Sequence, residues 1–439
     1  MKGLPAMRNS RISSIRTLNA EPLWDEDDLL QRLCHSLDFA EQAIRQLSAN
    51  DSTGDDSTQC GTIVPEKVIA ETALLLLAAS NVSSYAAVGP RVLRVASLLV
   101  PHARSQRMLR GICLQPSLAF DYAVGHVCLK RLGFYDGDFD AMLDLSVAAQ
   151  ASDGREREPH RVLEQEWLKQ SWLYPEGLPR LRSHGAGATS ALSRTIDLLH
   201  GTREDVSCFT HALMYMRDFN LFPRSLPRSR EELLAEAEGM LARCLDEQDY
   251  SLAAEVLLAW PLTGEEWSPA AIFAFRVLCR VQCDGGFQPS DANTYFHPNS
   301  YRTIYAMGML CAGVLAPGRR PPLTIPKVVV RAGAFGDVFE CFDPDDRKAH
   351  WQTTLGDLEP AERESLTDFL LSIALHREFG KKDFGAVQRL LAVGNALNLS
   401  PTPVATQATE MMVRITQFAE ILSYSVPLPA CDVVEEEYA

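Results

Sequence analysis

The sequence contains no apolar run long enough to cross a membrane. A membrane-spanning helix needs ~18 consecutive residues that are mostly apolar. The most apolar stretch, Ala70 to Ala79, is shorter and is interrupted by Glu71 and Thr72. The N-terminus is basic but lacks the apolar segment of a signal peptide. We therefore predict a disordered basic leader over residues 1–24 and a cytoplasmic protein with no membrane span.

Paired cysteines are also missing. The chain has 11 cysteines, an odd number, and they are scattered without a Cys-x-x-Cys pair. Several lie inside apolar segments, as Cys113, Cys128, Cys279 and Cys311 do. Because disulfides persist mainly in oxidising compartments, this pattern predicts buried free thiols in a reducing compartment.

Common catalytic motifs are absent. There is no Gly-x-x-x-x-Gly-Lys-Ser/Thr phosphate loop, no Gly-x-Gly-x-x-Gly turn after a strand, no His-Glu-x-x-His and no Gly-x-Ser-x-Gly. Each motif supplies a geometry that its chemistry requires. Nucleotide hydrolysis, nicotinamide-dependent redox chemistry and serine hydrolysis are therefore disfavoured.

The chain has fewer basic than acidic residues. The chain has 42 Lys and Arg against 57 Asp and Glu, and its net charge is −15. Binding to nucleic acid requires a cationic surface, so we predict no nucleic-acid partner. The acidic balance suits a cationic or neutral substrate.

Helical periodicity is present along almost the whole chain. Apolar residues recur at steps of three and four, as in Leu29, Leu33, Leu37, Ala40 and Ile44. This spacing is typical of amphipathic helices. It recurs in the windows 65–79, 87–100, 116–132, 138–150, 160–173, 188–200, 206–218, 230–246, 250–260, 269–282, 300–315, 361–379, 384–397 and 404–424. We predict an all-α protein.

Helix-start signals and one exception refine this prediction. Ser229 precedes acidic residues, and the pair Ser268-Pro269 stands before another periodic window, as at helix N-termini. Only Thr324 to Val330 has the β-branched composition of a short strand.

Composition also divides the chain. A Pro-rich segment over 316–326 reads APGRRPPLTIP and predicts a linker. We expect a helical domain over 25–315, C-terminal helices over 327–430 that complete or cap it, and an acidic tail over 431–439.

The segment 281–315 indicates a more specific architecture. It contains an apolar helix end, a Gly-Gly-Phe turn at 285–287, a loop with His297 and a helix that carries Thr303 and Tyr305. This order resembles one repeat of the α/α toroid, the barrel of paired helices in protein prenyltransferases, triterpene cyclases and lanthionine synthetase C-like cyclases. The resemblance implies a ring of helices whose turns at one rim meet the substrate.

The loop of this segment is the first candidate site. Its polar residues are Cys283, Asp284, Tyr295, His297, Tyr301 and Tyr305. A histidine such as His297 exchanges protons near neutral pH because its unperturbed pKa is about 6.5. In the alternative, Asp284 caps a helix and His297 bonds a backbone carbonyl.

The segment 207–218 is the second candidate site. Cys208, His211, Tyr215 and Asp218 are three or four residues apart, so they share one face of a helix. A polar stripe on an otherwise apolar helix costs stability unless it is hydrogen-bonded or used. It predicts either a catalytic wall or a satisfied network between helices.

The third candidate site is the helix start at 158–168. Arg161 can clamp an anion or a carbonyl group, with Glu164 orienting it and His160 beside it. The alternative is an exposed face of ordinary salt bridges.

Zinc is an open alternative. Protein prenyltransferases bind zinc through Asp, Cys and His, and lanthionine synthetase C-like cyclases through two Cys and one His. This chain offers such ligand types at Cys208, His211, Cys283, Asp284 and His297. It lacks both families' ligand signatures, so no cofactor is favoured.

Terpenoid cyclisation is a further alternative. The string Asp343-Pro344-Asp345-Asp346 matches the letters of the class II cyclase acid. Its polar surroundings give no sign of a buried carboxyl with a raised pKa, so this reaction is disfavoured.

These features lead to a hypothesis of natural-product biosynthesis. The strings 159–164, 210–213 and 301–303 resemble those of uncharacterised all-α bacterial proteins found near natural-product genes. The expected enzyme is a cyclase that adds a thiol of a modified peptide to a dehydroamino acid. The residues assigned to it are His211 and His297 as acid and base, Tyr215, Tyr305 and Arg161 as donors, and Asp218 or Asp284 as orienting groups.

Two other functions stay open. One is a non-catalytic helical adaptor that binds a leader peptide or another biosynthetic enzyme. The other is a zinc-dependent prenyl or peptide transferase.

Overall fold

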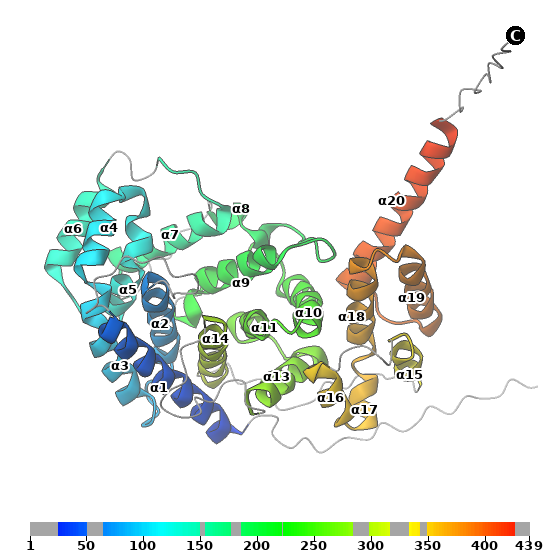
Figure 1. Cartoon of the computed structure of the whole chain (residues 1–439), viewed down its shortest axis with the longest axis horizontal. Helices are drawn as coiled ribbons and strands as arrows, with labels where there is room; N and C mark the ends of the chain where they lie inside the picture. The colour runs from blue at the N-terminus through cyan, green and yellow to red at the C-terminus, as the bar shows by residue number, and fades with distance from the viewer. Residues whose placement is uncertain are drawn as a thin grey trace, which may run out of the picture.

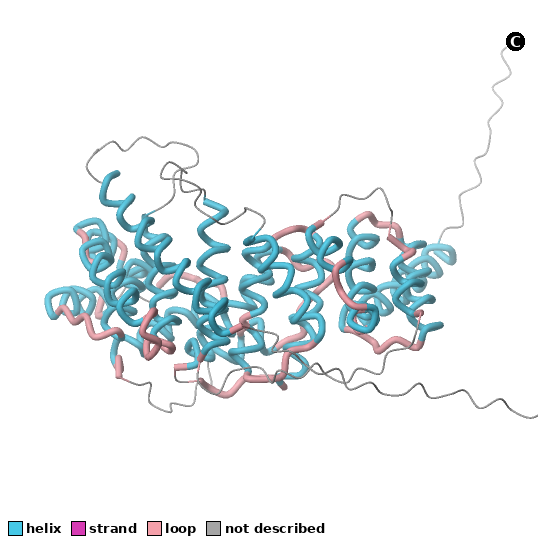
Figure 2. The backbone as a smooth tube through the Cα atoms, turned by 90° about the horizontal axis from the view of Figure 1, so that it is seen from below, coloured by secondary structure: helices cyan, strands magenta, loops and turns pink. Residues whose placement is uncertain are grey.

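The computed structural model describes residues 25–50, 65–149, 154–176, 186–221, 223–283, 298–316, 333–342 and 349–425. Within these ranges the chain forms helices and loops and contains no strand (Figure 2). The all-α prediction is confirmed. The predicted leader, tail and strand, and all but the first residue of the predicted linker, lie outside the described ranges.

Six helices form a closed ring of contacts. They are α2 (Pro65–Ser80), α5 (Ala119–Arg131), α7 (Pro159–Leu173), α9 (Arg203–Arg217), α11 (Tyr250–Leu257) and α14 (Pro298–Leu315). Each packs on the next in this order, and α14 returns to α2 (Figure 1). Such a helix has neighbours on several sides, which explains why α2 and α5 are apolar around most of their circumference.

Further helices pack on the outside of this ring. α1 (Glu26–Asn50) and α3 (Gly89–Ala103) cover α2, and α1 also covers α14. α4 (Gln106–Leu114) and α6 (Gly137–Val147) cover α5, and α8 (Ala186–Thr189) lies on α7. α10 (Arg230–Asp246) and α13 (Pro269–Val281) cover α11, and α12 (Ala259–Thr263) follows α11 directly. The toroid remains a prediction, and this cyclic order of contacts supports it.

A glycine allows α1 to approach α14 closely. A Cβ atom on Gly308 of α14 would lie 2.6 Å from Cβ of Ser36 on α1. The Ser36 hydroxyl donates to the carbonyl oxygen of Ile304 at 2.9 Å. The outer helix therefore sits directly against the backbone of the ring helix.

The C-terminal helices lie beside the ring. They are α15 (Ala334–Phe339), α16 (His350–Gly356), α17 (Pro360–Glu364), α18 (Thr367–Gly380), α19 (Phe384–Leu397) and α20 (Pro403–Ser425). α18 and α20 pack on α10, and α16 packs on α13, which are both outer helices (Figure 1). Since α14 already closes on α2, these helices extend the molecule at one side and do not complete the ring.

Several helix starts are as predicted. The hydroxyl of Ser229 accepts from the backbone N–H of Glu232 at the start of α10, and that of Ser268 accepts from Ala271 at the start of α13. Each cap satisfies a backbone donor that the first turn leaves without a partner.

The predicted helix over 188–200 is wrong. The segment contains only the end of the short helix α8 and a single 3-10 turn. Gln407 of α20 replaces the missing helical hydrogen bonds, because its amide donates to the carbonyl of Ile196 at 2.6 Å and accepts from the N–H of Leu198 at 2.8 Å. A tertiary contact overrides the local apolar periodicity here.

Candidate functional site

Neighbouring ring helices run in the same direction. His160 of α7 contacts Cys208 of α9, and about two turns later Trp167 packs on Tyr215. The contacts advance together along both helices, which requires parallel axes. The same reasoning holds from α9 to α11 and α12 through the pairs Thr210–Glu255 and Arg217–Leu262. The positive N-terminal ends of these helix dipoles therefore lie on one side of the ring.

Charged and polar side chains from five ring helices lie close to one another. We call them the central cluster: Lys67 and Glu71 of α2, Arg161 and Glu164 of α7, His211 and Tyr215 of α9, Glu255 of α11, and Tyr301 and Arg302 of α14. The pKa of His211 responds to charges on α2, α7 and α14 as well as to its own burial, so these helices face a common point.

His211 and Glu255 form the titrating pair of the cluster. Nε2 of His211 lies 3.8 Å from Oε2 of Glu255. Burial raises the pKa of Glu255 to about 7, and burial also lowers the pKa of His211. Each shift favours the neutral form of its group. Near neutral pH the pair offers a neutral imidazole base beside a carboxylic acid.

Thr210 opposes the rise in the pKa of Glu255. Its hydroxyl oxygen lies 3.0 Å from the carbonyl oxygen of Ser207 and 3.3 Å from Oε2 of Glu255. A hydroxyl has a single proton, and a carbonyl oxygen can only accept. When the hydroxyl donates to Oε2 of Glu255, it stabilises the carboxylate form and opposes the larger effect of burial.

Glu164 holds two donors at the adjacent wall. Nη1 of Arg161 donates to its Oε2 at 2.7 Å, and the hydroxyl of Tyr215 donates to its Oε1 at 2.6 Å. Burial raises the pKa of Tyr215 well above its ordinary value, so this hydroxyl keeps its proton. Arg161 itself is 45% exposed, and Glu164 holds it in place as a guanidinium that can meet an anion.

The opposite wall is formed by α2 and α14. Nε of Arg302 lies 3.4 Å from Oε1 of Glu71, and burial raises the pKa of both Glu71 and Tyr301. Tyr305 is buried, and its hydroxyl shares a hydrogen bond of 2.9 Å with Thr72. Tyr305 therefore belongs to the packing of this wall, whereas Tyr301 and Arg302 reach the cluster.

The structure brings together five of the residues that were predicted from sequence: Arg161, Glu164, His211, Tyr215 and Tyr301. His160 lies beside them, with its ring centroid 6.4 Å from that of His211. Asp284, Tyr295 and His297 lie outside the described residues. Cys283 is placed elsewhere, 3.8 Å from Nη2 of Arg32 on α1.

Asp218 does not orient a histidine as predicted. It is fully buried and accepts from both terminal nitrogens of Arg131, at 2.6 and 2.9 Å. It also accepts from Nε1 of Trp167 at 2.6 Å. The residue follows α9 with a left-handed backbone, φ 47°, which turns it away from the helical stripe that predicted its role.

Sequence reasoning missed four members of the cluster: Lys67, Glu71, Glu255 and Arg302. Glu255 carried a usable signal, because it is a lone carboxylate within the apolar helix α11, and Glu71 stands where α2 becomes apolar. Lys67 and Arg302 are near helix starts and look like ordinary surface charges in the sequence.

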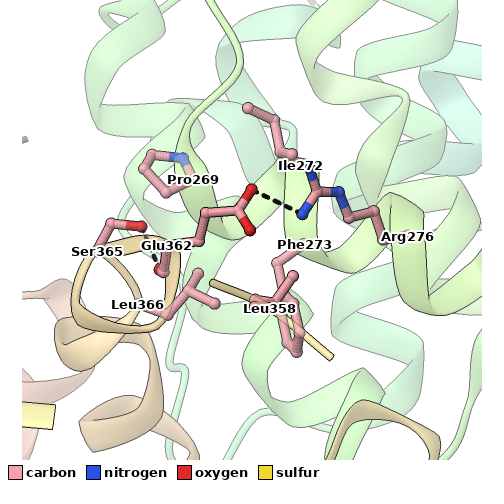
Figure 3. A pocket seen from close by; sticks show the side chains of 8 residues that line it. All are labelled: Pro269, Ile272, Phe273, Arg276, Leu358, Glu362, Ser365 and Leu366. Carbon is pink, nitrogen blue, oxygen red and sulfur yellow. Dashed lines mark hydrogen bonds and ion pairs between the residues drawn. The ribbon is translucent and has the colours of Figure 1, made fainter. Parts of the chain in front are cut away.

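A second feature is a small pocket between α13 and the segment from Leu358 to Leu366 (Figure 3). Its lining is Pro269, Ile272, Phe273, Arg276, Leu358, Glu362, Ser365 and Leu366. Arg276 and Glu362 neutralise each other at 2.9 Å across it. It holds no nucleophile or titrating pair, so the central cluster is the stronger candidate site.

The described residues were also searched for membrane-spanning helices and for disulfides. No described helix combines the length and apolarity that a membrane span needs. The nine cysteines in the described ranges are free thiols.

The comparisons with known proteins give one family. A family model matches residues 34–312, which run from within α1 to within α14 and include the other five ring helices in full. No curated protein and no solved structure matches the chain. The match covers well over half of the sequence, and the chain belongs to the family described as Domain of unknown function (DUF6895).

Proposed function

We propose that this protein is a proton-transfer enzyme that binds its substrate at the central cluster. The observation that carries the proposal is the pair of His211 and Glu255, a neutral base beside a carboxylic acid on adjacent ring helices. General acid–base groups are effective when their pKa values lie near the working pH. Arg161 and Arg302 supply positive charge for an oxyanion that forms between them.

The reaction class that fits these groups best is cyclisation by addition. His211 removes the proton of a substrate thiol, and the sulfur adds to the β-carbon of a dehydroamino acid in the same peptide. The enolate oxygen is stabilised by the Arg161 and Arg302 guanidinium groups, and Glu255 returns a proton to the α-carbon. The product is a thioether with the same atoms as the substrate, so no oxidant or reductant is needed.

A modified peptide is the proposed substrate, and the cytoplasm is the proposed location. A peptide thiol stays reduced there, as do the free cysteines of this chain. Binding a flexible chain at a ring of helices brings its two reacting groups together, which removes much of the entropic barrier to ring closure.

The test uses a synthetic peptide with one cysteine and one dehydroalanine. Ring closure leaves the mass unchanged but removes the thiol, so alkylation followed by mass spectrometry measures it directly. We expect wild-type protein to speed the loss of free thiol and His211→Ala to abolish the effect. His200→Ala is the matched control, because His200 is exposed and lies outside the ring. Equal rates with wild-type protein and with buffer would reject peptide cyclisation.

The second candidate function is binding without catalysis. Its support is α20, whose distal part exposes Val413, Phe418 and Leu422. An exposed apolar helix face is a frequent site of protein association. If this function holds, Phe418→Ser weakens capture of a partner while His211→Ala leaves capture intact.

A further inference from the structure

Three side chains at the start of α7 and α9 form a second cluster. His160, Glu204 and Cys208 each offer one ligand atom, and these atoms all lie within 4.8 Å of one another. Pro159 begins α7 directly before His160, and Glu204 and Cys208 are one turn apart on α9. A capping box at Thr202 fixes the first turn of α9 on which Glu204 stands.

The spacing of these atoms fits a metal ion. Zinc binds sulfur at about 2.3 Å and imidazole nitrogen at about 2.1 Å, so a tetrahedral site separates the two ligand atoms by about 3.6 Å. Here Sγ of Cys208 lies 3.1 Å from Nδ1 of His160, and a small rotation of either side chain opens this distance. A further carboxylate, Glu158, has an oxygen 3.6 Å from the same nitrogen.

The local charges favour a cation over a reactive cysteine. Glu204 offers a carboxylate oxygen within 4.8 Å of the ligand atoms of His160 and Cys208, and Glu158 has an oxygen 3.6 Å from Nδ1 of His160. Negative charge therefore lies beside both ligand atoms. A reactive thiolate needs positive groups beside it. A divalent cation instead compensates the negative field and takes the thiol as thiolate.

We propose that His160, Glu204 and Cys208 form a zinc site at the rim of the ring. Three protein ligands leave a fourth position open, which is the pattern of catalytic zinc. This set differs from the one predicted from sequence, because only Cys208 is common to both. His160 connects the site to the central cluster, because its ring centroid is 6.4 Å from that of His211.

The open position suits a substrate thiol. Zinc would lower the pKa of a bound thiol, and His211, which lies beside the ligand His160, would accept the proton. This role rests on the proposed function, whereas the metal site itself does not.

The experiment is a titration of the full-length, metal-stripped protein with Co²⁺ and then Zn²⁺. A thiolate–cobalt bond gives a charge-transfer band in the near ultraviolet, which Zn²⁺ removes by competition. We expect one equivalent per chain for wild-type protein and for the control Cys113→Ser, whose thiol is exposed on α4. Cys208→Ser should lose the band, and His160→Gln should bind at least about tenfold more weakly.

Circular dichroism shows whether each variant is folded. Absence of saturable binding, or an unchanged band in Cys208→Ser, would overturn the metal site. Metal binding without peptide cyclisation would support the metal site and reject the proposed cyclisation. Cyclisation by metal-free protein at the full rate would support the proposed reaction and reject a catalytic role for zinc.

Discussion

Nε2 of His211 lies 3.8 Å from Oε2 of Glu255, although the two residues belong to different helices of the ring. Both groups are drawn toward their neutral forms by burial, His211 by a lowered pKa and Glu255 by a pKa of about 7. Burial of the two side chains therefore works against an ion pair between them and favours a neutral base beside an acid.

The raised pKa of Glu255 predicts a specific pH dependence of stability. Its ordinary pKa is 4.5 and its folded value about 7, so between these pH values the folded state binds more protons than the unfolded state. The free energy of unfolding then falls as pH rises through this window and is level above it. Glu255→Gln carries no charge and should gain up to about 3 kcal/mol relative to wild type above pH 7.

Urea titrations at pH 5 and pH 8 measure this difference. Arg302 and Arg203 oppose the shift and Asp249 adds to it, so the measured gain reports their balance. Glu231→Gln, at an exposed position of α10, is the control and should change little at either pH. An equal effect of Glu255→Gln at both pH values would contradict the raised pKa.

Catalysis should have a bell-shaped pH profile. Activity requires neutral His211 and protonated Glu255, so kcat/KM falls below the lowered pKa of His211 and falls again as pH rises through about 7. His211→Ala should reduce the rate by about 10²–10⁴-fold. Glu255→Gln should lose activity, and the fall of kcat/KM on the alkaline side of the profile should disappear. A kcat/KM that stays level from pH 6 to pH 9 would show that Glu255 is not the general acid.

Asp218 is expected to act on stability. Removing one partner of its buried pair with Arg131 leaves an uncompensated charge, so Asp218→Ala should cost about 3–5 kcal/mol. The double variant Arg131→Met/Asp218→Leu removes both charges and should recover part of this loss. Thermal unfolding measures both variants. A normal melting temperature for Asp218→Ala would show that the pair is not structural.

The contact of Gly308 with Ser36 predicts a packing defect on substitution. A Cβ atom there would lie 2.6 Å from Ser36 Cβ, so Gly308→Ala should cost about 1–3 kcal/mol. Ser36→Gly should relieve part of the clash in the double variant. Gly336→Ala is the matched control, because nothing lies within 4 Å of its added Cβ. Equal stability of the two alanine variants would contradict the close approach of α1 and α14.

Part of the candidate site is visible in the sequence. The polar stripe of His211 and Tyr215 depends only on the spacing within one helix, and the pairing of Arg161 with Glu164 is likewise local. Glu255 could not be assigned from local spacing, since its role depends on its contact with His211 of another helix. The Asp218 prediction failed because the helix ends at Arg217 and the next residue turns into a left-handed conformation.

The helical class follows from the order of apolar residues along the chain, because helical periodicity is a short-range property that each segment carries by itself. Tertiary packing decided the rest: the closure of α14 on α2, the position of the C-terminal helices outside the ring and the partner of Asp218. The pKa shifts of His211 and Glu255 were decided there too, since desolvation depends on how several helices together exclude water from one point.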